Sequence, residues 1–72
     1  MRKVFKLQDL DCANCAAKME AAINKIDGVE KATMSFMAQK LTIVADDARF
    51  DAIMDEVERA CAKVEPDMEI LR

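Results

Sequence analysis

The chain has 72 residues, of which 53% are hydrophobic and 35% charged, and it carries a net charge of −3 at pH 7. This length allows one small domain with a limited core, so we expect residues 1–72 to form a single folded unit. The acidic balance argues against nucleic-acid binding, which uses clustered lysine and arginine. No apolar run reaches the ~18 residues that span a bilayer. No apolar signal segment follows the basic N-terminal residues, so we expect a cytoplasmic domain.

Alternating polar and apolar residues predict four strands. Residues 3–8, 29–36 and 40–45 alternate with the period of two that is typical of half-buried strands. Residues 37–39 are a short turn, which makes the second and third strands an antiparallel hairpin. Residues 68–71 predict a last short strand at a sheet edge.

Apolar residues at helical spacing predict two amphipathic helices. The first covers residues 15–26, with Asn14 as its N-cap and Gly28 as its C-cap. The second covers residues 46–64, because aspartates suit a helix N-terminus and Pro66 stops any continuation.

The resulting order, βαββαβ, predicts an α+β fold of the ferredoxin-like type. A four-stranded antiparallel sheet with two helices on one face would bury every apolar face. Alternating chain directions then place the end of the second helix, near Cys61, at the same end of the domain as residues 9–15. Four methionines fall on the predicted inward faces and are expected in the core: Met19, Met34, Met54 and Met68.

Two cysteines in the loop before the first helix are candidate metal ligands. Cys12 and Cys15 have the CxxC spacing that lets two sulfurs converge on one ion. We expect the helix macrodipole to lower the pKa of Cys15 at the helix start, since a thiolate is favoured there. Thiolates select soft or borderline ions, which makes Zn²⁺, Cd²⁺ and Cu⁺ the candidates.

Asp11 and Cys61 are further candidate ligands. The Asp11 carboxylate would add a hard oxygen that suits a divalent ion better than Cu⁺. Cys61 lies on the apolar stripe of the second helix, so we expect it to pack as a small hydrophobe. Ligation is the alternative, because the topology places Cys61 near the loop cysteines. Zn²⁺ normally takes four ligands. A site with open positions could pass its ion on, or share it between two chains; the expected state is otherwise a monomer.

Two other functions fit the same loop. A free-standing copper chaperone could hold Cu⁺ between two thiolates without Asp11. A dithiol redox protein could use the CxxC pair directly. The chain lacks the Trp and Pro that flank CxxC in thioredoxin-like enzymes, which argues against the redox reading.

The loop and its surroundings resemble the heavy-metal-associated domains, which carry a Gly-Met-x-Cys-x-x-Cys motif in a βαββαβ fold of about this length. Here the motif, residues 9–15, reads Asp-Leu-Asp-Cys-Ala-Asn-Cys. The resemblance covers nearly the whole chain, including residues 16–20, 27–29 and 39–43. Such domains occur as copper chaperones, as periplasmic mercury carriers and as cytosolic domains of P-type metal ATPases.

The Asp-Cys-x-x-Cys form is similar to the zinc/cadmium/lead-exporting branch, in which the acid is a metal ligand. The resemblance therefore implies a site of Cys12, Cys15 and Asp11 for Zn²⁺ or Cd²⁺. It implies delivery of metal to, or regulation of, the transport domains of a P-type ATPase, or exchange with a donor or acceptor protein. The chain itself has no catalytic machinery. It departs from the pattern at Asp9, which replaces the usual Gly, and at Ala62, where copper-binding members often carry Tyr or Lys.

Overall fold

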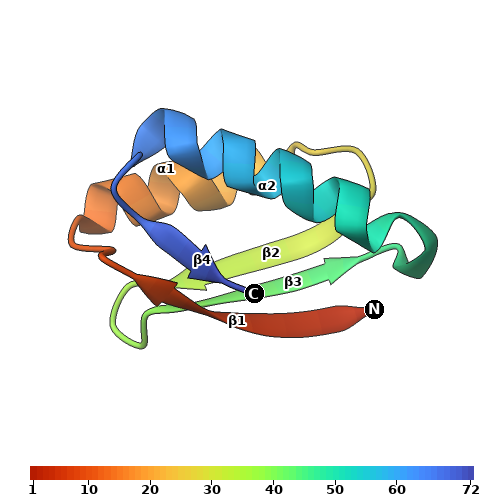
Figure 1. Ribbon diagram of the computed structural model, residues 1–72, viewed down its shortest axis with the longest axis horizontal. Helices are drawn as coiled ribbons and strands as arrows, with labels where there is room; N and C mark the ends of the chain where they lie inside the picture. The colour runs from red at the N-terminus through yellow and green to blue at the C-terminus, as the bar shows by residue number, and fades with distance from the viewer.

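The computed structural model describes all 72 residues and confirms the predicted βαββαβ order (Figure 1). The elements are β1 (Arg2–Gln8), α1 (Ala13–Asn24), β2 (Val29–Ser35), β3 (Lys40–Ala45), a 3₁₀ turn η1 (Asp47–Arg49), α2 (Phe50–Val64) and β4 (Glu69–Leu71). The strands begin and end within a residue of the predicted positions. No helix is long and apolar enough to cross a membrane.

The four strands form one antiparallel sheet in the order β2-β3-β1-β4. Both helices cover the same face of this sheet (Figure 1). This confirms the ferredoxin-like arrangement, the β2–β3 hairpin and the place of β4 at an edge.

The core lies between the helices and the sheet. The largest fully buried side chains come from both helices and from β3: Met19, Ile23, Leu41, Ile43, Ile53, Met54 and Val57. All four methionines that were expected in the core are buried. The alternation in β3 is strict, because Leu41, Ile43 and Ala45 face the helices while their neighbours do not.

Helix α1 begins earlier than predicted. It starts at Ala13, and its N-cap is Cys12 rather than Asn14. A thiol is not among the favoured capping groups. The Cys12 sulfur nevertheless accepts a hydrogen bond from the backbone N–H of Cys15 at 3.2 Å.

Helix α1 also ends earlier than predicted. Its C-cap is Lys25, so Gly28 does not cap it. Gly28 has a different role: its φ of +97° lies in the left-handed region, where a side chain is strained. A Cβ there would lie 2.8 Å from Cδ1 of Ile53 on α2. The glycine therefore lets the chain pass closely under α2 on its way into β2.

Helix α2 begins at Phe50 rather than at residue 46. Asp46 instead caps the 3₁₀ turn, where its carboxylate accepts a hydrogen bond from the N–H of Ala48 at 3.1 Å.

Side chains of α1 close the free edge of β2. Asn24 exchanges two hydrogen bonds with the backbone of Ala32, at 2.9 and 3.0 Å. The Glu20 carboxylate accepts a third from the N–H of Met34 at 2.8 Å. An edge strand is otherwise open to pairing with other chains, so these contacts protect the edge and fix α1 on the sheet.

Candidate metal centre

The candidate metal loop, residues 9–12, joins β1 to α1. Figure 1 shows this loop, the β2–β3 turn and the connection from α2 to β4 at the same end of the domain. The topology predicted this position for the end of α2. Leu10 is only 3% exposed and packs under the loop. Asp9 has a φ of +64°, so the loop adopts a left-handed conformation at the position where the resemblance expects Gly. Aspartate tolerates this region better than most residues.

Gln39, in the β2–β3 turn, holds the loop in place. Its side-chain amide donates hydrogen bonds to the carbonyl oxygens of Leu10 at 2.7 Å and Phe36 at 2.8 Å. The backbone carbonyl oxygen of Gln39 accepts a hydrogen bond from the N–H of Leu7 at 2.8 Å. These bonds position the backbone immediately before Asp11. Sequence reasoning missed this residue, since a bond across 29 positions leaves no periodic signal.

The two loop cysteines are neighbours. Both are free thiols and half-buried. Cys12 has an extended backbone, with φ −133° and ψ 113°, which turns its sulfur back over the first turn of α1. The 3.2 Å bond from the Cys15 N–H to that sulfur fixes the relative position of the pair.

The thiol with the lowered pKa is Cys12, so the expectation for Cys15 was wrong. Hydrogen bonds from the Cys15 thiol and backbone N–H lower the pKa of Cys12. The same thiol–thiol hydrogen bond, together with desolvation, raises the pKa of Cys15 to about 11. The physical reason is the cap: the N–H groups at the helix start point at the Cys12 sulfur, and a second charge beside it is unfavourable.

Two carboxylates stand near the thiol pair. Asp11 is exposed and directly precedes Cys12. Glu65, half-buried at the end of α2, faces the pair closely enough that its charge works to raise the pKa of both Cys12 and Cys15. Sequence reasoning missed Glu65, although the same topology that pointed to the end of α2 could have indicated it.

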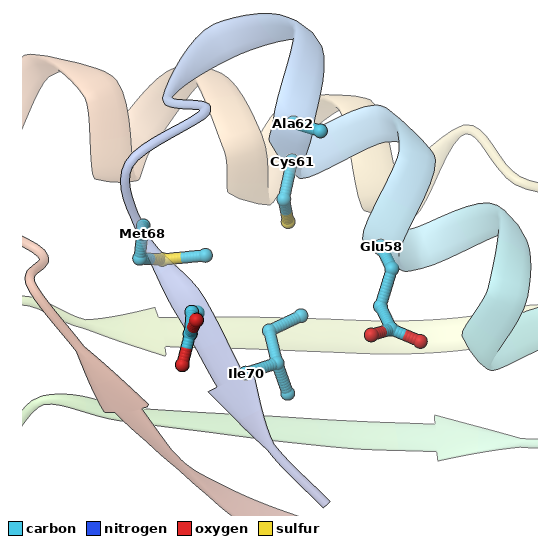
Figure 2. A pocket seen from close by; sticks show the side chains of 6 residues that line it. Glu58, Cys61, Ala62, Met68 and Ile70 are labelled. Carbon is cyan, nitrogen blue, oxygen red and sulfur yellow. The ribbon is translucent and has the colours of Figure 1, made fainter.

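Cys61 lies one helical turn before Glu65, on the buried face of α2. It is 2% exposed, and desolvation followed by the charge of Glu58 raises its pKa to about 11. Figure 2 shows its sulfur pointing from α2 toward the sheet, into a groove of about 350 Å³ beside Met68 and Ile70. Cys61 thus packs as a small hydrophobe, as expected; its role as a ligand stays a prediction.

The donors at this end of the domain suit a soft or borderline metal ion. The two sulfurs are already adjacent, Glu65 faces them, and Asp11 directly precedes Cys12 in the chain. No three Cys, Asp or Glu side chains converge on one point in this conformation. A third protein ligand therefore requires a rotamer change, which the exposed Asp11 side chain can make freely.

A βαββαβ sandwich with a CxxC pair at the start of its first helix defines a class of small metal-binding domains. Residues 4–66 match the family described as the heavy-metal-associated domain. The chain belongs to this family, as the sequence resemblance predicted.

Similar sequences are found in metal-transporting ATPases. The chain is 37% identical over 68 residues to a cadmium-transporting ATPase of Staphylococcus aureus, covering 89% of this chain and 9% of the relative. It is 36% identical over 62 residues to the zinc/cadmium/lead-transporting P-type ATPase of Escherichia coli (strain K12), covering 86% and 8%. The chain thus spans less than a tenth of the length of these relatives.

Several solved structures have the same fold as this chain. The oxidized MerP of Ralstonia metallidurans CH34 superimposes with a TM-score of 0.76 at 19% identity, covering 100% of this chain and 97% of the other. The CopZ metallochaperone gives a TM-score of 0.75 at 18% identity, covering 99% and 100%. At these identities the likeness supports the fold alone.

Proposed function

We propose that this domain binds Zn²⁺ or Cd²⁺ and serves a heavy-metal-exporting P-type ATPase on its cytoplasmic side. The observation that carries the proposal is the adjacent Cys12–Cys15 pair, with Glu65 facing it and Asp11 directly before Cys12 in the chain. The relatives named as cadmium and zinc transporters support the same choice of ion.

The donor set favours a divalent ion over Cu⁺. Two thiolates alone satisfy Cu⁺, whereas Zn²⁺ and Cd²⁺ gain from additional charged oxygen ligands. The metal also compensates the charge of the two thiolates that bind it, since Cys12 and Cys15 must both lose their protons to act as ligands. Binding therefore displaces the thiol protons and relieves repulsion within the site.

The site is built for transfer of its ion. The loop lies at one end of the domain, and its thiols are only half-buried. Two sulfurs and one oxygen leave a coordination position open, through which an acceptor ligand can enter before the first ligands leave. We propose that the domain delivers its ion to, or regulates, the transport domains of the ATPase in this way.

Competition with a chromophoric chelator, under reducing conditions, tests the choice of ion. We expect the Cys12→Ser/Cys15→Ser variant to lose Zn²⁺ binding. We expect Asp11→Asn to weaken Zn²⁺ at least about 10-fold, because even the loss of a group that only supports a ligand costs about 10–100-fold, and to leave Cu⁺ affinity unchanged. Asp9→Asn is the matched control, because it removes the same charge two residues away. Equal Zn²⁺ affinity in Asp11→Asn and Asp9→Asn, with Cu⁺ bound tightly by both, would favour the copper chaperone.

A further inference from the structure

The face of the sheet that the helices leave open is basic, although the chain as a whole is acidic. The register places alternate residues of β1, β2 and β3 on this face. Its cations come from all three strands: Arg2, Lys6, Lys31 and Lys40. Glu69 of β4 is the one carboxylate in register with them, and Glu30 lies in the bulge at the β2 edge. Since the chain carries −3 in total, the residues outside this face are acidic on balance.

Two of these cations stand directly opposite each other. Lys6 of β1 pairs with Lys40 of β3, and both are exposed. Directly opposed side chains have Cβ atoms about 5 Å apart, and like charges in this position destabilise a sheet. No carboxylate pairs with either lysine among the ion pairs of the structure. An anion placed over the pair would remove this repulsion.

A shallow hollow on the same face is lined by side chains that can bind phosphate. It has a volume of about 380 Å³ and is lined by Arg2, Lys31, Thr33, Thr42 and Val44. Two cations and two hydroxyl groups are donors for phosphate oxygens. The hollow and the lysine pair lie on the same face of the sheet, so a continuous anionic surface could contact both at once.

Exposed apolar side chains complete the surface. Val4 is 51% exposed between the hollow and the lysine pair, and Leu71 is 45% exposed beside Lys6. Cations around partly exposed aliphatic side chains are the pattern of proteins that lie on a membrane interface. The other surfaces of the domain, which together carry the negative charge of the chain, would be repelled by the same membrane, and this favours one orientation.

We propose that the open sheet face, defined by Arg2, Val4, Lys6, Lys31, Lys40 and Leu71, docks onto an anionic phospholipid bilayer. A bilayer is flat, continuous and rich in phosphate, which matches the even spread of cations over three strands. Docking in this orientation leaves the metal loop, at the end of the domain, free to exchange its ion. The proposal does not depend on which metal binds.

Co-sedimentation of the domain with sucrose-loaded vesicles tests the proposal. We expect binding to phosphatidylcholine vesicles that contain phosphatidylglycerol, and none to pure phosphatidylcholine. Each cation near an anionic surface contributes about five-fold to partitioning, so Lys6→Gln/Lys40→Gln should lower it about 30-fold. Raising the ionic strength to about 1 M shortens the Debye length to about 3 Å and should release the protein.

The matched control is Lys18→Gln/Lys25→Gln, which makes the same change in net charge on exposed positions of α1 and its C-cap. We expect this variant to bind vesicles as the unmodified domain does. A second face variant, Arg2→Gln/Lys31→Gln, should repeat the loss seen for the lysine pair. Equal partitioning of face and control variants would overturn the proposal. So would amide NMR shifts at Thr33 and Thr42 caused by inorganic phosphate or polyglutamate without any vesicle binding.

Discussion

Replacing Gln39 by alanine tests how the metal loop is held. The side chain donates two hydrogen bonds, to Leu10 at 2.7 Å and to Phe36 at 2.8 Å. Each such bond contributes about 1 kcal/mol net. Gln39 has a φ of +54°, and alanine in the same backbone conformation bears a similar strain, so the variant isolates the lost bonds. We expect a loss of about 2 kcal/mol in the free energy of unfolding.

Urea denaturation followed by far-UV circular dichroism measures this loss. With a slope near 1 kcal/mol/M for so small a domain, the midpoint should fall by about 2 M. Gln8→Ala is the matched control, because Gln8 is exposed on β1 and its side chain makes no hydrogen bond within the protein. We also expect faster amide exchange at residues 11–15 in Gln39→Ala only. Identical midpoints and identical exchange in the two variants would refute the role assigned to Gln39.

Three further predictions concern packing and thiol chemistry. Gly28→Ala should destabilise the domain by about 2–4 kcal/mol in the same urea assay, because it adds backbone strain and a Cβ 2.8 Å from Ile53; an unchanged midpoint would contradict this. Iodoacetamide at neutral pH, followed by peptide mass mapping, should modify Cys12 before Cys15, since the pKa of Cys12 is lowered and that of Cys15 is about 11; the reverse order would contradict the cap. The pKa of buried Cys61 is raised from 9.0 to about 11, so the folded state favours the protonated thiol. The contribution of Cys61 to the free energy of unfolding should therefore be fully present below pH 9 and fall by about 2 kcal/mol between pH 9 and pH 11. Cys61→Val should make the free energy of unfolding depend less steeply on pH in that range. An equally steep dependence would rule out this contribution of Cys61.

Local patterns predicted most of the fold. Alternation in residues 40–45 and helical spacing after Phe50 are properties of short windows, and the structure follows both. The predicted ends of α1 were wrong, because the contacts that decide them leave no trace in the local hydrophobic pattern. The start of α1 depends on a thiol acting as a cap at Cys12, and its end leaves Gly28 free to pass under α2.

The candidate site was predicted in part for a similar reason. The Cys12–Cys15 pair is a sequence motif and could be found directly. The order of the two thiol pKa values depends on which sulfur receives the N–H groups, and that follows from one backbone turn. Gln39 and Glu65 reach the loop from distant parts of the chain, so only the folded structure brings them to notice.

The most direct test of the proposed metal site is a ¹¹³Cd NMR spectrum of the reduced domain with one equivalent of cadmium. The chemical shift reports how many sulfurs bind the ion. We predict a shift typical of two sulfurs that moves in Asp11→Ala and stays in Asp9→Ala. A shift typical of three sulfurs would bring Cys61 or a second chain into the site. A shift typical of two sulfurs that is the same in all three proteins would contradict the role of Asp11 as a ligand.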